Sequence, residues 1–322
     1  MRPYKVLRLR QGSPEWLEYR RTHIGASDAP AIAGESPYSS PYSLWCEKVD
    51  GGKEIDPATA HRFRIGHAME GVARGLYTEQ TGLRLRPGRV LESRETPWIF
   101  ASLDYEAADR IVEAKWTTSS RFDDGLPGDV LVQVTHQMAV SGVRSTDVAV
   151  LSPYAFRIFP VAFDEAFWSN ILHVEGVFYH EHLMTGIPPA PDGSEATTAA
   201  LRSQHPEDDG QVIVADADAA IIIRRLLDAK ARAAIIEGEI GGMENALRYI
   251  MGDASQMVGP GFSVSYKKAK DSVKVDWSAV AQRLLDFHPD LLADYDVAIH
   301  AATTTQPGTR RLLVRAEKGV QE

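Results

Sequence analysis

Cysteine is almost absent from this chain of 322 residues, which has only Cys46. A single thiol cannot close an internal disulfide, and it cannot supply the four thiolates of a zinc ribbon or an iron–sulfur cluster within one chain. We therefore interpret Cys46 as a small core residue and expect no iron–sulfur cofactor.

Long apolar runs are also absent. No stretch approaches the roughly 20 apolar residues that a membrane-spanning helix needs. The N-terminal stretch MRPYKVLRLRQGSPEW is charged throughout and lacks the apolar core of a signal peptide. These two features predict a cytoplasmic protein with no membrane partner.

Basic charge is not in excess, because 35 Lys and Arg face 44 Asp and Glu, a formal net charge of −9. An acidic total still allows a local basic groove, since exposed charges act mostly within a Debye length of about 8 Å. A cluster of acidic residues is also what a metal site requires. The net charge therefore argues neither for nor against a nucleic-acid partner.

Linker-like composition occurs at residues 186–210, which are rich in Pro, Gly, Ser, Thr and Asp. We predict a first domain over 1–190, a linker over 191–210 and a second domain over 211–322. In the first domain, strand and helix patterns follow in the order strand, strand, strand, helix, strand. That order predicts an α/β or α+β core with a central mixed sheet flanked by helices.

The second domain is predicted to be an α+β extension and shows no catalytic spacing. A helical pattern covers about 216–251, and we expect its glycines to interrupt it: Gly238, Gly241 and Gly242. Three further elements are expected after it: a hairpin over 261–277, a short helix over 277–289 and a strand over 309–316.

The most informative stretch of the first domain is SLDYEAADRIVEAKW, residues 102–116. Side chains alternate faces along a strand, so Glu113 and Lys115 share one face while Val112 and Ala114 share the other. Asp104 ends the preceding run of strand-forming residues, and YEAADR has the composition of a hairpin loop. The pattern predicts a hairpin that brings two carboxylates and one ammonium together.

These groups suit a magnesium site that hydrolyses phosphodiesters. Magnesium prefers hard oxygen ligands, which Asp104, Glu113 and the carbonyl of Ala114 can supply. Lys115 beside the metal can orient or deprotonate a water, or stabilise charge on a phosphate. Taken alone, a Glu–Lys pair is also common on an exposed strand.

Neighbouring helices add candidates for the same site. Glu70, among small residues on a helix, is a candidate third carboxylate, and Gln133 and Gln137 lie one helical turn apart on one face. Each of these residues has an ordinary alternative as a surface or capping residue. We interpret His136 as a partly buried or solvated histidine, because no second His or Cys lies at ligand spacing.

In this setting the chain resembles the phage λ-type exonucleases, also called the YqaJ viral recombinase family, within the PD-(D/E)XK nuclease superfamily. The resemblance spans about residues 11–185, and SLD stands where the superfamily motif has Pro-Asp. Its pieces occur in order: WLEYRRTHIGASDAPAIAGESPYSSPYSLWCEK, GHAMEGVARGLYTEQTG, ASLDYE, IVEAKW and QVTHQMAVSG.

The resemblance implies a PD-(D/E)XK core and a magnesium-dependent 5′→3′ exonuclease on linear duplex DNA, with manganese able to substitute. Such a phage or prophage enzyme leaves 3′ single-stranded tails for recombination in a bacterial host. Its implied partners are double-stranded DNA ends and a single-strand annealing protein, and members of the family can form homotrimers.

The resemblance also assigns roles to residues. Asp104, Glu113 and the Ala114 carbonyl would bind metal, with Glu70 as an additional ligand or water-positioning group. Lys115 would activate the attacking water, and Gln133 matches a glutamine of the family. A second set would hold the 5′-phosphate or other parts of the DNA: Arg20, Ser27, Arg21 as a substitute for Arg20, and Gln137.

The sequence also fits other functions. The core also fits a restriction-type endonuclease, or a Cas4-like nuclease, although one cysteine argues against the cluster of the latter. A non-catalytic scaffold that binds DNA ends is a third reading. Four lysines of the predicted second-domain hairpin either contact DNA backbone or protect a solvated strand edge: Lys267, Lys268, Lys270 and Lys274.

Overall fold

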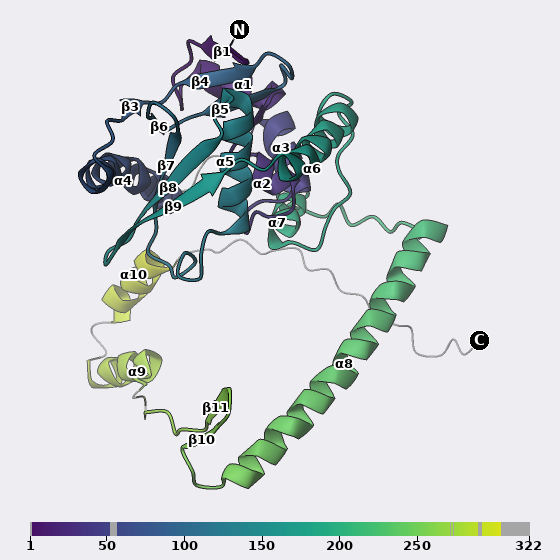
Figure 1. Ribbon diagram of the computed structural model, residues 1–322. Coiled ribbons are helices and arrows are strands. Elements are labelled where there is room, and N and C mark those ends of the chain that lie inside the picture. The colour runs from purple at the N-terminus through teal and green to yellow at the C-terminus, as the bar shows by residue number, and fades with distance from the viewer. Residues whose placement is uncertain (1, 52–56, 271, 273, 289–291, 304–322) are drawn as a thin grey trace. The chain divides into compact units, whose positions relative to one another are not determined.

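The computed structural model describes residues 2–51, 57–270, 272, 274–288 and 292–303. The chain divides into two compact units, Met1–His205 and Pro206–Glu322 (Figure 1). None of the described helices is long and apolar enough to cross a membrane.

Unit 1 contains two sheets, and both combine parallel and antiparallel pairs. The five-stranded sheet has the order β3 (Arg86–Pro87), β6 (Tyr105–Glu106), β7 (Ile111–Trp116), β8 (Ser145–Leu151), β9 (Phe156–Ala162), and only β7 and β8 are parallel. The four-stranded sheet has the order β1 (Tyr4–Leu7), β4 (Val90–Ser93), β5 (Ile99–Ser102), β2 (Ile24–Gly25), with β5 and β2 parallel.

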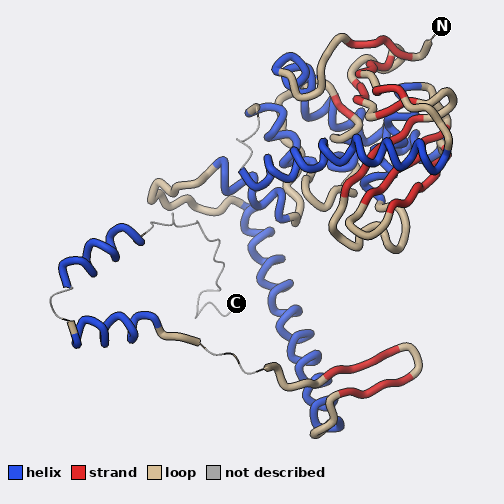
Figure 2. Tube along the Cα trace, turned by 90° about the vertical axis from the view of Figure 1, so that its left-hand side faces the viewer, coloured by secondary structure: helices blue, strands red, loops and turns tan. Residues whose placement is uncertain are grey.

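Helices flank the strands of unit 1 (Figures 1 and 2), so the predicted mixed α/β core is confirmed. Its helical segments are α1 (Pro14–Thr22), α2 (Ala29–Ile32), α3 (Pro41–Asp50), α4 (Pro57–Thr81), α5 (Gly128–Ser141), α6 (Glu165–Val177), the π-helical turn η1 (Phe178–Leu183) and α7 (Glu195–Gln204). Helix α4 packs against β7, β8 and β9, whereas α5 packs against β4, β5 and β8.

Strand β7 lies between these helices, and its alternation decides which residues face which helix. Val112 belongs to the apolar cluster that includes Tyr77 of α4. Ile111 belongs to the main core with Val130 and Val134 of α5. Because faces alternate along a strand, Glu113 and Lys115 project on the α5 side with Ile111.

Part of the segment predicted to be a linker, residues 191–210, is helical. Residues Glu195–Gln204 form α7, which begins at the N-cap Ser194 and packs on α3. The Thr197 hydroxyl lies 2.7 Å from that of Ser40, and the Tyr42 hydroxyl donates to Gln204 Oε1 at 2.8 Å. Most of the Pro and Gly residues that suggested a linker precede this helix, and Pro206 and Gly210 follow it, while the sequence of the helix itself is rich in alanine.

Unit 2 contains α8 (Ala217–Met251), the hairpin β10 (Gln256–Gly259) and β11 (Phe262–Ser265), α9 (Trp277–Phe287) and α10 (Leu292–Ala302).

Two predictions for this unit are wrong. Helix α8 runs through its three glycines without interruption, because each costs only about 1 kcal/mol in a helix of 35 residues. The lysines at 267, 268, 270 and 274 follow β11 instead of lying in the hairpin strands. The expected strand over 309–316 lies outside the described residues.

Candidate active site

A cavity of about 200 Å³ opens beside the edge of β7. Its walls come from five segments of the sequence: the start of α1, the turn after β2, helix α4, the β5–β7 region and helix α5. Every residue predicted from the sequence to take part in catalysis lines it: Glu70, Asp104, Glu113, Ala114, Lys115 and Gln133. The fold therefore brings these side chains together.

Asp104 can bind the backbone of β7 because the neighbouring strand β6 is short. Strand β6 pairs with β7 only through Val112 and Ile111, so Ala114 has no strand partner on that side. The Ala114 N–H donates instead to Asp104 Oδ2 at 2.9 Å. The N–H and C=O of one strand residue point to the same side, and the Ala114 carbonyl therefore faces Asp104 as well.

Only 3 % of the surface of Glu113 is exposed. Three hydrogen-bond donors hold its carboxylate. Its Oε1 accepts from Lys115 Nζ at 2.7 Å and from Gln133 Nε2 at 2.8 Å. Its Oε2 accepts from Gln137 Nε2 at 2.8 Å. This set of donors fixes the orientation of the carboxylate.

The predicted contact between Gln137 and DNA is wrong for this conformation. Gln137 has no exposed surface and donates to Glu113 and to the carbonyl of Ser102. It lies one helical turn beyond Gln133, on the side of Glu113 away from the cavity. Gln137 is therefore a positioning residue for Glu113.

Burial and neighbouring charges shift the pKa values of the ionisable groups at this site. Burial raises the pKa of Asp104 well above its usual range, and the negative charge of Glu113 raises it further. Burial alone would lower the pKa of Lys115, but the negative charges of Glu113 and Asp104 outweigh burial and raise it. Lys115 is therefore a cation beside these two carboxylates, suited to stabilise phosphate charge or orient a water.

The donor set fits a divalent cation that prefers oxygen ligands. The adjacent carboxylates of Asp104 and Glu113 and a backbone carbonyl are hard ligands, and a cation would relieve the repulsion that contributes to the raised pKa of Asp104. Glu70 lines the same cavity, but its Oε1 is paired with His67 Nδ1 at 2.8 Å. Within the described residues, no three His, Cys, Asp or Glu side chains form a preformed metal cage.

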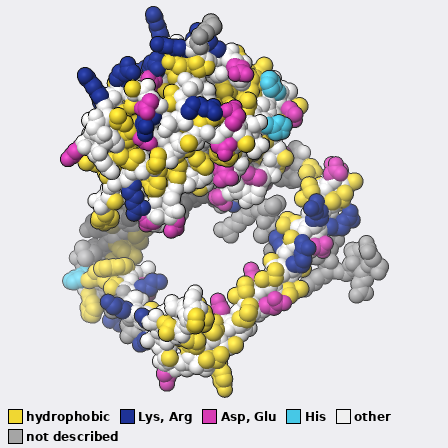
Figure 3. Space-filling model, viewed as in Figure 1, with side chains coloured by type: hydrophobic (Ala, Val, Ile, Leu, Met, Phe, Trp, Pro, Cys, Tyr) yellow, Lys and Arg dark blue, Asp and Glu magenta, His cyan; other side chains and the backbone are white. Residues whose placement is uncertain are grey.

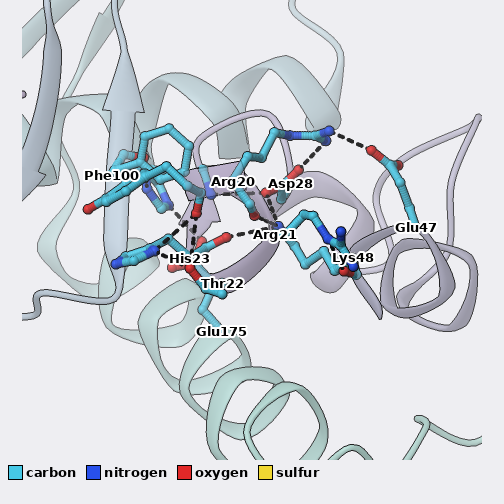
Figure 4. Close-up of polar contacts among 12 residues, drawn as sticks. Arg20, Arg21, Thr22, His23, Asp28, Glu47, Lys48, Phe100 and Glu175 are labelled. Carbon is cyan, nitrogen blue, oxygen red and sulfur yellow. Dashed lines mark hydrogen bonds and ion pairs between the residues drawn. The ribbon is translucent and has the colours of Figure 1, made fainter. Parts of the chain in front are cut away.

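The predicted phosphate-binding residues are separated in this structure. Ser27 is exposed and lines the cavity, whereas Arg20 does not line it. The Arg20 guanidinium lies between Asp28 and Glu47, with Nη2 2.6 Å from Asp28 Oδ1 (Figure 4). Arg21 donates to the carbonyls of Lys48 and Val49 and so does not replace Arg20 at the site.

A buried ion pair beneath the Ser27 turn was not found from the sequence. Lys48 Nζ lies 2.7 Å from Asp28 Oδ2, and both side chains are almost fully buried (Figure 4). The other Asp28 contacts are Arg20 and the N–H of Gly25. The one sequence signal was an aspartate inside the small apolar run IGASDAPAIAG.

Lys48 and Asp28 respond differently to this environment. Burial lowers the pKa of Lys48, and the nearby Arg20 cation contributes in the same direction. Burial would raise the pKa of Asp28, but the charges of Lys48 and Arg20 outweigh it and hold that pKa at about 2. Asp28 is therefore an anion, and the cations Lys48 and Arg20 both pair with it.

Two other features differ from the sequence-based interpretation. His136 is fully buried instead of partly buried or solvated: its Nδ1 lies 2.7 Å from Glu175 Oε1 and its Nε2 3.0 Å from the carbonyl of Phe100. Trp16 was not identified as a site residue, yet it lines the cavity and its Nε1 donates to Ser102 Oγ at 3.1 Å.

The sequence of this region matches a known family. A family model described as the YqaJ-like viral recombinase domain matches residues 15–144. Residues 15–144 are therefore similar to the YqaJ-like viral recombinase domain. The matched range contains all six residues predicted to take part in catalysis or metal binding.

Individual relatives extend the comparison. The uncharacterized protein YqaJ of Bacillus subtilis (strain 168) is 26% identical over 293 residues, which cover 86% of this chain and 88% of that protein. This match is longer than unit 1 and therefore includes part of unit 2.

Among solved structures, this chain is similar to an alkaline exonuclease, LHK-Exo, from Laribacter hongkongensis. The two are 20% identical with a TM-score of 0.46 over 54% of this chain and 94% of that chain. A phage related exonuclease from Haemophilus somnus 129PT is 12% identical with a TM-score of 0.40, covering 51% of this chain and 96% of that chain.

Proposed function

We propose that this chain is a magnesium-dependent 5′→3′ exonuclease that digests one strand of linear duplex DNA and leaves 3′ single-stranded tails for recombination. The observation that carries the proposal is the single cavity in which Asp104, Glu113, the Ala114 carbonyl and Lys115 meet, within the YqaJ-like domain. Magnesium prefers such oxygen ligands, and manganese accepts the same set.

The metal would be held by Asp104, Glu113 and the Ala114 carbonyl, with Glu70, which lines the same cavity, as an additional ligand or water-positioning group. When bound, it supplies an activated water and neutralises charge on the scissile phosphate. The protein's own contribution is to keep Glu113 oriented through Gln133 and Gln137. Lys115 adds a fixed positive charge beside the phosphate.

Ser27 and Arg20 supply the proposed binding site for the 5′-phosphate. Ser27 lines the cavity already. Arg20 binds Asp28, which is buried, and Glu47, whose side chain is 43% exposed. A terminal phosphate can therefore take the place of the Glu47 carboxylate while Arg20 keeps its contact with Asp28.

The proposed partners follow from this activity. They are double-stranded DNA ends and a single-strand annealing protein that takes over the tails, and the proposed place of action is the cytoplasm of a bacterial host. A trimer of unit 1 around DNA stays a prediction from the family resemblance.

The decisive experiment is digestion of a linear duplex labelled separately at each end, in magnesium, with Lys115→Ala as the control. We expect mononucleotides from the 5′ label first and no product with the variant. Cutting of a closed circle would favour an endonuclease, and intact binding to ends without any cutting would favour a scaffold.

The phosphate site makes a separate prediction. Ends with a 5′-hydroxyl should be digested about tenfold or more slowly than ends with a 5′-phosphate, because they lack the anion that Arg20 and Ser27 would bind. Initial rates on two otherwise identical duplexes measure this difference. The Arg20→Lys variant should lose most of the preference, since lysine cannot form a bidentate contact. Equal rates for wild-type protein on both ends would contradict the assignment.

A further inference from the structure

Helix α8 leaves many large apolar side chains in solvent. It is a single helix of 35 residues, labelled in Figure 1, and Figure 3 shows hydrophobic side chains exposed along it. Ile222, Ile236, Met243 and Ile250 are between 54% and 68% exposed. Exposed apolar surface of this extent marks an interaction site.

The apolar residues of α8 follow a heptad repeat. They recur at alternating steps of three and four residues, the spacing of a coiled-coil seam. The members of this α8 seam are Ala219, Ile222, Leu226, Ala229, Ala233, Ile236, Ile240, Met243, Leu247 and Ile250. Counting from Ala219 as the first heptad position, the three glycines occupy outward positions and leave the α8 seam intact.

Charges beside the α8 seam are divided between the two halves of the helix. The flanking residues are basic in the N-terminal half, at Arg225, Lys230 and Arg232. They are acidic in the C-terminal half, at Glu237, Glu239 and Glu244. Figure 3 shows the Lys and Arg side chains gathered over one half of the helix. A partner helix must present the opposite order of charge.

We propose that two copies of this chain associate through α8 as an antiparallel coiled coil. The antiparallel arrangement places the basic half of each helix against the acidic half of the other. In the full-overlap register, Arg232 of one copy faces Glu239 of the other, and Lys230 faces Glu237. A parallel arrangement would set Arg225 against Lys230 and Glu239 against Glu244, which repel.

Packing in the α8 seam favours the same register. Each alanine then lies opposite an isoleucine of the other copy: Ala219 with Ile250, Ala229 with Ile240, and Ala233 with Ile236. Alternation of small and large side chains fills the space between two helices evenly. Pairing also compensates for the helix-destabilising glycines, because burial of an apolar face supplies most helical stability in proteins.

The pairing is tested by the mass of the full-length protein in light scattering after size exclusion. The Ile236→Lys variant places a charge in the α8 seam and should halve the mass of the wild-type assembly. Ile235→Lys is the matched control, because Ile235 is 63% exposed but lies outside the seam, and this variant should keep the wild-type mass. Equal masses for wild type and Ile236→Lys, or loss of pairing in both variants, would overturn the proposal.

The orientation is tested by distances between spin labels at outward positions of α8. With a rise of 1.5 Å per residue, labels at Arg224→Cys are offset along the axis by about 30 Å in the antiparallel pair, but labels at Ala231→Cys by only about 10 Å. The natural Cys46 is buried, so the introduced cysteine is the labelled site. Equal short distances at both positions would overturn the antiparallel arrangement. Neither test uses nuclease activity, so its outcome is independent of the proposed function.

Discussion

Replacing Glu113 by glutamine should reduce nuclease activity by about 1,000-fold or more while preserving the fold. The substitution keeps the shape of the side chain but removes the negative charge that would hold the metal and that now pairs with Lys115. Loss of one fixed electrostatic contact in an active site costs about 100- to 1,000-fold, and here the lost group is also a proposed metal ligand. Initial rates on a linear duplex measure the effect.

Two further measurements separate loss of chemistry from loss of structure. Titration calorimetry with Mn²⁺ should show that the Glu113→Gln variant has lost metal binding, while its thermal unfolding stays close to that of the wild type. Glu106→Gln is the matched control, because Glu106 lies on the adjacent strand β6 and pairs with Arg89 outside the cavity. Its activity should stay close to that of the wild type. Retained activity in Glu113→Gln would exclude Glu113 from the site.

Replacing Lys48 by methionine should lower the free energy of unfolding by about 3–5 kcal/mol. The substitution leaves Asp28 buried with one cation fewer, and removing one partner from a buried ion pair has this cost. Urea unfolding at pH 7 measures the change. The control is Lys5→Met, which removes a largely exposed partner of Glu92 and should cost less than about 1 kcal/mol.

The same ion pair predicts how stability depends on pH. The pKa of Asp28 is about 2 in the folded protein, below its ordinary value of 3.8. Its contribution is therefore complete above about pH 4 and is lost as the pH falls toward 2. The Asp28→Asn/Lys48→Met double variant should lose this part of the pH dependence of stability. A Lys48→Met variant as stable as the wild type would show that the pair does not support the Ser27 turn.

The proposed catalytic face of β7 was predictable because it depends on local geometry. Alternation along one strand places Glu113 and Lys115 together, and the spacing of Gln133 and Gln137 on a helix puts both on one face. The structure adds that both glutamines bind the Glu113 carboxylate, one on each oxygen. The burial of Gln137 depends on how α5 packs on two sheets, which no local pattern contains.

Charged residues whose partners lie far along the chain were predicted less well. Arg20 was expected at the phosphate site, yet its partners Asp28 and Glu47 are 8 and 27 residues away. His136 was expected to be partly solvated, but Glu175, 39 residues later, pairs with it inside the core. Pairing of this kind is decided by tertiary contacts between α1, α3, α5 and α6.

Sequence alone determined the proposed chemistry of this protein, because residue types and their short-range spacing predict the acidic pair, the lysine beside it and the α/β core. Tertiary structure decided which of these groups share a cavity and what charge each carries. It placed Ser27 at the cavity and bound Arg20 to two carboxylates, and it set Lys115 beside Glu113 and Asp104, whose charges raise the pKa of the lysine. Burial and long-range charge set these properties, and both arise only when distant segments pack together.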